Sequence, residues 1–118
     1  MGVTGAVGAY GERVAVRALE SAGYAVVDRN WRCRAGELDV VAMRGGVVVF
    51  VEVKCRRSLA YGPPAAALTD AKIAHLRAAA AAWLALHSLA EAVVRFDVVS
   101  VLRPLTGPPV VEHVEGAF

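Results

Sequence analysis

Two adjacent glycines, Gly45 and Gly46, separate two runs rich in β-branched and apolar residues, 36–43 and 47–54. A two-residue turn with glycine at both central positions matches the right-handed twist of antiparallel strands, because glycine adopts positive φ without steric cost. The runs on either side have the composition of β-strands. The sequence therefore predicts a tight β-hairpin, and the length of its turn fixes which residues face each other.

The predicted register of this hairpin brings charged residues together. With the turn centred on the two glycines, Asp39 lies opposite Glu52, and Glu37 lies opposite Lys54. Alternate residues of a strand share a face, and directly paired residues point to the same side of the sheet. The four side chains are therefore expected to converge. Opposed carboxylates repel each other unless a cation lies between them, and Mg²⁺ is commonly held by one or two carboxylates.

Glu52 and Lys54 also interrupt an otherwise apolar run, 47–53. An unpaired charge in a buried strand is costly, so charges in such a run need a partner or a function. We therefore interpret Asp39 and Glu52 as candidate ligands of Mg²⁺ or Mn²⁺, with Lys54 beside them. A structural ion pair, in which Lys54 neutralises Glu37 and Glu52, is the alternative that the spacing leaves open.

Periodicity along the rest of the chain predicts an α/β fold. We expect helices at 8–22 and, capped by Thr69, up to about His87, and strands at 24–31, 36–43, 47–54, 93–101 and 110–114. The order α-β-β-β-α-β(-β) suits a mixed central sheet flanked by helices, because the long second helix can make a parallel crossover. The segment 58–68 is rich in glycine and proline and is expected to be a loop. A length of 118 residues fits a single domain, 1–118.

Composition narrows the class of protein without identifying it. Hydrophobic residues make up 57% of the chain, which favours a packed core, and the net charge of +2 does not by itself indicate nucleic-acid binding. Cys33 and Cys55 have no metal-binding spacing and are expected to be reduced thiols. The chain has no signal peptide pattern and no apolar run long enough to cross a membrane, so a cytoplasmic location is expected.

Other ionisable residues receive structural interpretations. His75, His87 and His113 show no metal-ligand spacing, and we assign them no role. Asp97 is expected to pair with its neighbour Arg95 rather than to take part in catalysis.

Four segments together resemble a known family. These are YGE (10–12), RNWRCRAGELDVVA (29–42), FVEVKCRR (50–57) and RFDVV (95–99). The second and third contain strings similar to the PD-(D/E)xK nuclease signature, and the set resembles the YraN-type family of small bacterial proteins described as predicted endonucleases. The arrangement is also similar to that of archaeal Holliday-junction resolvases. The resemblance implies a restriction-endonuclease-like core.

The resemblance also implies roles for particular residues. It gives the metal-ligand role to Asp39 and Glu52 and the catalytic lysine role to Lys54, and it adds Glu12 from the first helix. The family usually has a hydroxyl residue where Cys55 stands, so a contact from such a hydroxyl is not expected here. For Glu12 the alternative is a solvated glutamate favoured by the helix dipole.

Several basic residues are candidates for contacts with phosphates. Arg32, Arg34, Arg56 and Arg57 flank the hairpin strands, and Lys72 lies near the start of the second helix. Contacts of this kind would position nucleic acid without reading its sequence. Ordinary solvated surface charges are the alternative for all five.

The sequence thus predicts metal-dependent hydrolysis of phosphodiester bonds in nucleic acid, with DNA, branched or repair-related, as the expected substrate. One alternative is a nucleic-acid-binding module that has a weak or degenerate nuclease site. Another is a structural protein in which the charged cluster is an ion-pair network. A homodimer is a common arrangement for nucleases that cut two strands, although the sequence shows no dimer face.

Overall fold

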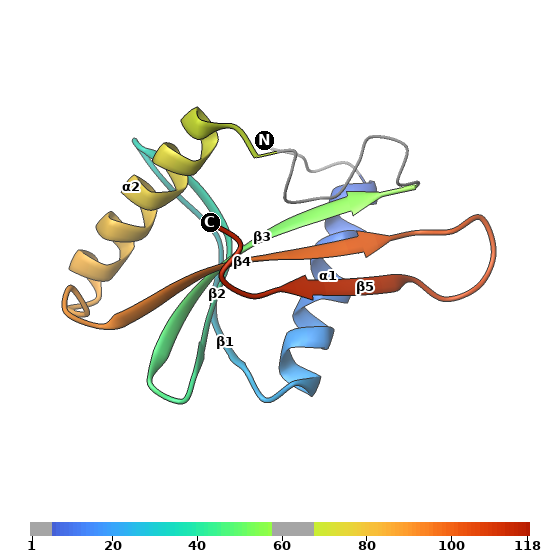
Figure 1. Cartoon of the computed structure of the whole chain (residues 1–118), viewed down its shortest axis with the longest axis horizontal. Helices are drawn as coiled ribbons and strands as arrows, with labels where there is room; N and C mark the ends of the chain where they lie inside the picture. Colours follow the sequence, from blue (N-terminus) through green and yellow to red (C-terminus); the bar gives the residue numbers. More distant parts are fainter. Residues whose placement is uncertain (1–5, 58–67) are drawn as a thin grey trace.

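A computed structural model describes residues 6–57 and 68–118. The predicted order of elements is confirmed, and most predicted boundaries differ from the observed ones by one or two residues (Figure 1). The elements are α1 (Ala6–Ser21), β1 (Ala25–Cys33), β2 (Gly36–Arg44), β3 (Val47–Arg56), α2 (Asp70–Leu86), β4 (Val93–Leu102) and β5 (Val110–Val114). Residues 58–67 of the predicted loop lie outside the described residues.

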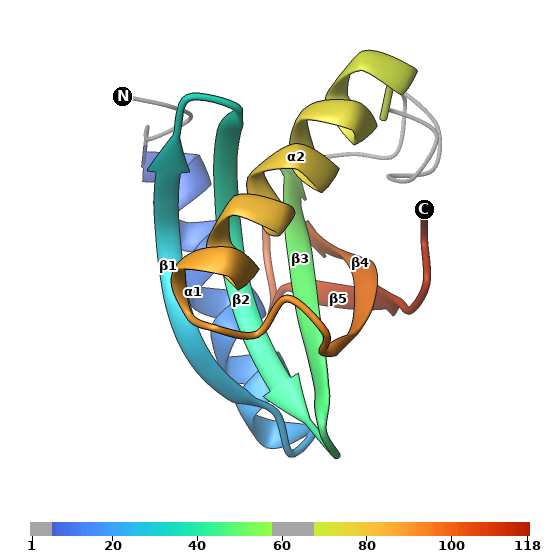
Figure 2. The ribbon, with the colours of Figure 1, turned by 90° about the vertical axis from the view of Figure 1, so that its left-hand side faces the viewer.

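The five strands form a mixed sheet in the order β1-β2-β3-β4-β5. Neighbouring strands are antiparallel except β3 and β4, which are parallel and are joined through α2. Figures 1 and 2 show α1 and α2 on opposite faces of this sheet. The predicted mixed sheet flanked by helices is therefore confirmed.

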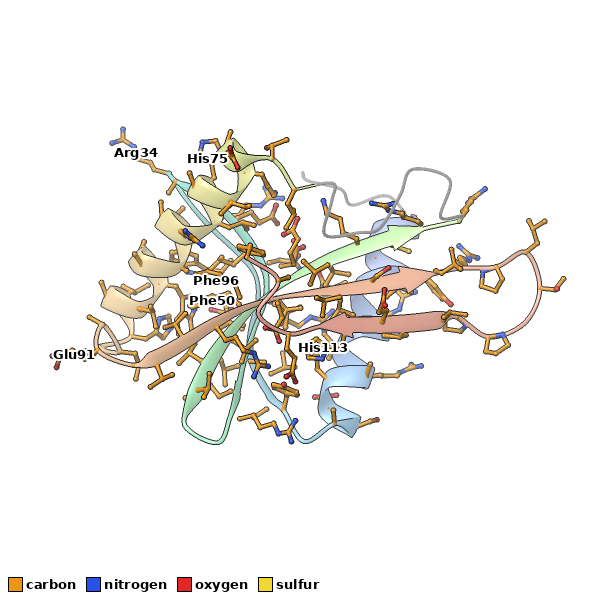
Figure 3. All side chains as sticks on the ribbon, viewed as in Figure 1. Arg34, Phe50, His75, Glu91, Phe96 and His113 are labelled. Carbon is orange, nitrogen blue, oxygen red and sulfur yellow. The ribbon has the colours of Figure 1, made fainter. Side chains whose placement is uncertain are left out.

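Each helix covers its own hydrophobic core. Ala15 and Leu19 of α1 pack with Val40 and Val49 of the sheet. Leu76 and Trp83 of α2 pack on the other face with Val48 and Phe50, and the Phe50 ring stacks on the Phe96 ring at 5.6 Å between centroids (Figure 3). Thr69 caps α2 as predicted, because its side chain accepts a hydrogen bond of 3.1 Å from the Lys72 N–H. The helices thus hold the sheet from both sides.

The hairpin turn has the predicted register. Arg44 pairs with Val47, and the ladder continues in step to Val40 and Val51, while Gly45 and Gly46 have φ values of 57° and 78°. The ladder then ends. The predicted pairings of Asp39 with Glu52 and of Glu37 with Lys54 are therefore wrong as strand pairings, because β2 no longer runs beside β3 at these positions.

A kink in two strands explains why the ladder ends there. The pairing of β1 with β2 passes from Arg29–Val40 to Trp31–Leu38 and omits Asn30 and Asp39. Asn30 has a φ of 51°, a left-handed conformation that asparagine tolerates better than most residues. Leu38 and Val40 consequently pack in different cores although they are two residues apart.

Beyond this kink the sheet is forked. β2 continues with β1 as far as the Cys33–Gly36 pair, whereas β3 continues with β4 as far as the Arg56–Leu102 pair. Figure 2 shows the two pairs of strands separating on the side toward which β3 runs. The space in the fork is accessible to side chains from both helices.

Among the residues that the structure describes, no helix is long and apolar enough to cross a membrane. Cys33 and Cys55 are both free thiols.

Candidate active site in the fork of the sheet

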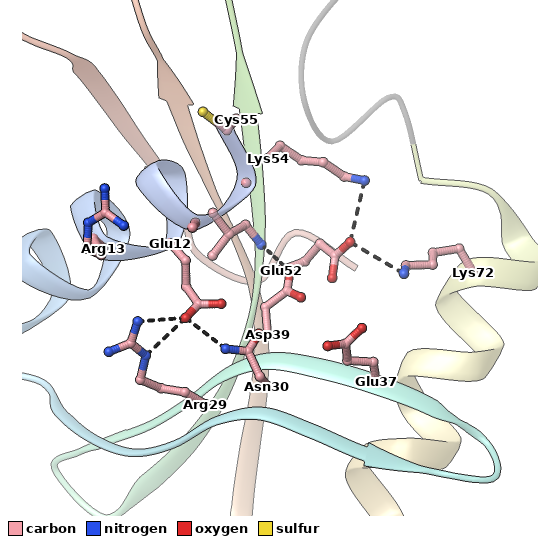
Figure 4. Close-up of a pocket in the computed structure, with 13 residues that line it drawn as sticks. Glu12, Arg13, Arg29, Asn30, Glu37, Asp39, Glu52, Lys54, Cys55 and Lys72 are labelled. Carbon is pink, nitrogen blue, oxygen red and sulfur yellow. Dashed lines mark hydrogen bonds and ion pairs between the residues drawn. The ribbon is translucent and has the colours of Figure 1, made fainter. Parts of the chain in front are cut away.

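A cleft of about 550 Å³ fills the fork between β2 and β3 (Figure 4). Its described lining residues come from α1, β1, β2, β3 and α2, so every element near the fork contributes. They are Gly8, Ala9, Glu12, Arg13, Arg29, Asn30, Glu37, Asp39, Glu52, Val53, Lys54, Cys55 and Lys72. The four carboxylates and four basic side chains in this set make the cleft rich in charge.

At Asp39 a hydrogen bond to the side chain takes the place of the missing strand pairing. Its Oδ2 accepts from the Val53 N–H at 2.9 Å, which holds the carboxyl group across the fork against β3. Burial, together with the neighbouring charge of Glu52, raises the pKa of Asp39 to about 7, although the Val53 N–H and Lys72 act in the opposite direction. Asp39 and Glu52 therefore lie close together, as the hairpin register predicted, although they are not paired in the ladder.

Glu52 is the least satisfied carboxylate in the cleft. Its side chain is only 5% exposed, and its Oε2 lies 3.4 Å from Lys54 Nζ and 3.7 Å from Lys72 Nζ. The other oxygen, Oε1, is buried and has no hydrogen-bond partner among the residues that the structure describes. A buried charged oxygen without a partner costs stability, since burial removes the water that would otherwise solvate it.

These carboxylates fit a hard divalent cation. Asp39 and Glu52 offer oxygen ligands, and Glu52 Oε1 is a buried acceptor without a donor, an arrangement that a cation would satisfy. No group of three or more His, Cys, Asp or Glu side chains able to hold a metal occurs within 6–57 and 68–118. Two carboxylates suit Mg²⁺ or Mn²⁺, which share their coordination with water and phosphate oxygens, better than Zn²⁺.

Glu12 reaches the cleft from α1, as the family resemblance implied, but it is already engaged. Its Oε1 accepts hydrogen bonds from Arg29 Nη2 at 2.7 Å, Arg29 Nε at 3.1 Å and Asn30 Nδ2 at 3.0 Å. Gly11 brings α1 close enough for this, because a Cβ at position 11 would lie 2.5 Å from Cys55 Cβ. The kink in β1 and the close approach of α1 thus place Glu12 at the wall of the cleft.

Glu37 has a different partner from the predicted one. Its Oε2 pairs with Arg32 Nε at 3.3 Å, across the β1–β2 pair, rather than with Lys54. The cause is the fork, which turns this end of β2 toward β1. Glu37 still lines the cleft and adds to its negative charge.

The structure separates the five predicted phosphate contacts. Only Lys72 lines the cleft. Arg32 is paired with Glu37, and Figure 3 shows Arg34 pointing away from the molecule at the β1–β2 turn. Arg56 and Arg57 lie at the end of β3, where Arg57 lines a second hollow.

Local sequence patterns do not identify the residues that hold Glu12. Arg29 stands in a family string and in a cluster of basic residues with Arg32 and Arg34, and Asn30 gives no signal beyond being a polar residue in a predicted strand. A strand asparagine followed by an aromatic residue is compatible with a left-handed kink, but many regular strands contain the same pattern. The function of Asn30 becomes visible only from its φ and its contact with α1.

Together these features define an α/β protein with a forked mixed sheet and a charged cleft at the fork, in which two lysines flank a buried carboxylate. The sequence model of "Uncharacterised protein family UPF0102" matches residues 11–101, and the chain belongs to this family. It is 58% identical to a UPF0102 protein of Beutenbergia cavernae, with 94% of each chain covered. It is 50% identical to one of Streptomyces griseus, with 98% of each chain covered. It is 46% identical to one of Geotalea uraniireducens, with 95% of this chain and 88% of the relative covered.

Proposed function

We propose that this protein is a metal-dependent nuclease that hydrolyses phosphodiester bonds, with DNA as its expected substrate, and that its sheet is a restriction-endonuclease-like core. The proposal rests on the resemblance of residues 36–42 and 49–56 to the PD-(D/E)xK signature and on the chemistry of the cleft. One observation carries it. Glu52 holds a buried oxygen without a partner beside a second buried carboxyl, Asp39, whose pKa is raised to about 7.

This observation favours a ligand site over an ion-pair network. In a network that only stabilises the fold, buried carboxylates are expected to have their hydrogen bonds satisfied. Here two lysines share one oxygen of Glu52 and leave the other without a partner. A divalent ion at Asp39 and Glu52 would supply a Lewis acid for a phosphate oxygen and a water of lowered pKa.

The two lysines are suited to the phosphate. Lys54 Nζ and Lys72 Nζ approach the same Glu52 oxygen from β3 and from α2, so the ammonium groups stand on either side of it (Figure 4). Lys54 is in position to orient the attacking water or to stabilise negative charge that develops on the phosphate. Lys72 adds a second positive charge for the substrate backbone. Glu12, held by Arg29 and Asn30, forms the α1 side of the cleft.

Charge balance supports metal binding before substrate binding. With Asp39 and Glu52 ionised, their two negative charges match those of Lys54 and Lys72. An added divalent cation would leave the cleft with an excess of positive charge. A phosphodiester anion would then be attracted to a site that, without the metal, offers it little electrostatic stabilisation.

Incubation with branched and linear DNA, and with RNA of the same sequence, tests the proposal when Mg²⁺ or Mn²⁺ is present. Lys54→Ala and Asp39→Asn are expected to lower the cleavage rate by roughly 10³-fold or more, as loss of a group that stabilises transition-state charge does. Glu112→Gln is a matched control, because Glu112 is exposed on β5 away from the cleft. Cleavage that persists in both cleft variants would show that the reaction takes place elsewhere.

The same samples distinguish the non-catalytic alternative. A binding module with a degenerate site would bind branched DNA and leave it intact. Isothermal titration with Mn²⁺ then decides whether the cleft takes a cation at all. Absence of Mn²⁺ binding, both with and without DNA, would contradict the metal site itself.

A further inference from the structure

A second hollow lies where β3 and β4 end. These strands are parallel neighbours, so the residues that follow them emerge side by side, and the Arg103 N–H donates a hydrogen bond of 2.8 Å to the Arg56 carbonyl. The hollow has a volume of about 210 Å³. Its lining residues in the described part of the chain are Arg57, Arg103, Pro104 and Leu105.

The charge of this hollow differs from that of the cleft. Within the described part of the chain, its lining contains two arginines and no carboxylate, and both arginines are exposed. In the cleft, by contrast, Lys54 and Lys72 face Glu52, and Arg29 faces Glu12. Two guanidinium groups around one hollow repel each other in the absence of an anion, and their planar donors match phosphate oxygens well.

Arg103 is held in place before any ligand binds. Its guanidinium lies 4.8 Å from the centroid of the Tyr10 ring, a cation–π distance, and Tyr10 itself packs against the core beneath α1. An exposed arginine normally loses side-chain entropy when it binds a ligand. Stacking on Tyr10 reduces that loss, so Arg103 is better prepared for an anion than a freely rotating surface arginine.

The hollow lies near the cleft. Cys55 lines the cleft and pairs with Val101 of β4, two residues before Arg103. Gly8 and Ala9, which precede the Tyr10 beneath Arg103, also line the cleft. A polymer that leaves the cleft past Cys55 would therefore meet Arg103 next.

We infer that Arg57 and Arg103 form a second phosphate subsite, which binds the backbone of a nucleic-acid strand whose scissile phosphate occupies the cleft. The inference rests on the proposed function and specifies its substrate. The protein acts on a strand that continues beyond the cleft toward the β4–β5 hairpin, rather than on a mononucleotide or a small phosphate ester. Pro104 and the fully exposed Leu105, at 101% relative exposure, offer apolar surface to the sugar.

Binding measurements test the subsite directly. Fluorescence anisotropy of a labelled duplex, with Ca²⁺ in place of Mg²⁺ to keep the DNA intact, gives Kd at several salt concentrations. The double variant Arg57→Gln/Arg103→Gln is expected to raise Kd by roughly tenfold or more, and to lower the slope of log Kd against log salt by about 0.9 for each lost contact. Arg17→Gln, on the exposed face of α1, removes one charge elsewhere and is expected to change neither quantity by more than about twofold.

Kinetics with two substrates separate a binding role from a structural one. Bis(p-nitrophenyl) phosphate is small enough to occupy the cleft alone, so the double variant should hydrolyse it at the wild-type rate. For duplex DNA, its KM should rise by roughly tenfold while kcat stays near the wild-type value. Tyr10→Leu, which removes the ring under Arg103 and keeps the apolar packing, should give a smaller increase in the same direction. Thermal unfolding of every variant checks that the fold is intact.

The outcomes distinguish this inference from the proposed function. Unchanged KM and salt slope in the double variant, with cleavage that still requires Lys54, would overturn the subsite and leave the nuclease assignment intact. Inorganic phosphate that protects the wild type but not the double variant from thermal unfolding, with equal DNA binding by both, would identify a free-anion site instead. A wild-type protein that neither binds nor cuts DNA would overturn both proposals.

Discussion

Two buried acidic groups in this sheet differ in how many hydrogen-bond partners surround them. Asp97 in β4 is completely buried, at 0% exposure, yet every side of its carboxylate is occupied. It accepts hydrogen bonds from Arg95 Nε and Nη2, both at 2.8 Å, from the Gly116 N–H at 3.0 Å and from His113 Nε2 at 2.6 Å. The expected pairing of Asp97 with Arg95 is thus confirmed. Asp39 and Glu52, in the fork, have fewer partners and leave one buried oxygen without any.

The pKa values of the two groups follow from this difference. Burial favours the neutral form of Asp97, but hydrogen bonds from Arg95, Gly116 and His113 outweigh it and lower its pKa below the ordinary value. For Asp39 burial and the charge of Glu52 prevail, and the pKa rises to about 7. Burial alone therefore does not decide the ionisation of a carboxyl group; the hydrogen-bond donors and charges around it also count.

The comparison separates a group that stabilises the fold from one that, under the proposed function, would bind a ligand. Asp97 and the residues that bind it, Arg95, His113 and Gly116, form a cluster that ties the C-terminal segment to the sheet. His113 belongs to β5, Gly116 follows it, and Arg95 also contacts Glu115 at 3.6 Å. In the described part of the chain, Glu52 makes longer ion pairs, of 3.4 Å to Lys54 and 3.7 Å to Lys72. A protein that leaves a carboxylate unsatisfied sacrifices stability locally, as is common where a site must bind something.

The largest expected difference is in stability. Asp97→Ala should lower the free energy of unfolding by about 3–5 kcal/mol, because it removes the buried acceptor that Arg95, His113 and the Gly116 N–H share. Glu52→Gln should lower it by less than about 1 kcal/mol, since the carboxylate is poorly satisfied to begin with. Urea unfolding of both variants in EDTA gives the two values. Equal destabilisation would remove the distinction between the two groups.

Metal binding should stabilise the folded protein through the carboxylates of the fork. At a free Mn²⁺ concentration of about 100 times Kd, the wild type should gain about 2.7 kcal/mol of unfolding free energy, as linkage requires for a ligand of the folded state. Glu52→Gln should lose most of this gain, while Glu112→Gln, changed on exposed β5, should keep it. Thermal unfolding with and without Mn²⁺ measures both. A gain that survives Glu52→Gln would place the cation elsewhere.

The pH dependence of stability should have opposite signs for the two groups. The folded-state pKa of Asp39, about 7, lies above its ordinary value of 3.8. The folded protein therefore loses stability as the pH rises from the ordinary pKa of Asp39 to its folded-state pKa. Asp39→Asn removes that effect and keeps an acceptor for Val53. It should be more stable than the wild type by on the order of 2 kcal/mol at about pH 8, and no more stable at about pH 4. Denaturant titrations at both pH values, without metal, check this, and an equal gain at both would contradict it.

Asp97 should show the opposite pH dependence of stability in the same denaturant titrations. Because its folded-state pKa is lowered, its contribution to stability is present above its ordinary pKa and is lost as pH falls through the folded value. Asp97→Asn should therefore be costly near neutral pH and progressively less costly in acid. A cost that does not change with pH would show that packing, rather than charge, explains the role of Asp97.

The smallest expected effect tests the edge of the Asp97 cluster. The Tyr24 hydroxyl accepts from Arg95 Nη2 at 2.6 Å and donates to Glu115 Oε2 at 3.1 Å. Tyr24→Phe removes both hydrogen bonds and keeps the buried ring, so it should cost about 0.5–1.5 kcal/mol. Mn²⁺ affinity, measured by titration, should not change, since Tyr24 does not line the cleft. A change in that affinity would show that the two regions are coupled.

Much of this architecture could be predicted from local patterns. Gly45 and Gly46 fixed the turn and the register of the hairpin as far as Val40 and Val51, because two-residue turns leave little choice. Thr69 fixed the start of α2 through its cap. The nearness of Asp39 and Glu52 followed from the same register. The predicted register was wrong at Glu37, whose partner beyond the fork is Arg32 instead of Lys54.

By itself, then, the sequence determined the order of the elements, the hairpin register and the group of charged residues near its open end, because these depend on periodicity and turn geometry over short stretches. Tertiary structure decided the rest. The kink at Asn30 accompanies the fork, in which one oxygen of Glu52 has no partner among the described residues. The close approach of α1 at Gly11 brought in Glu12, and α2 contributed Lys72. Whether a buried charge is satisfied depends on donors supplied from distant parts of the chain, and no local pattern records them.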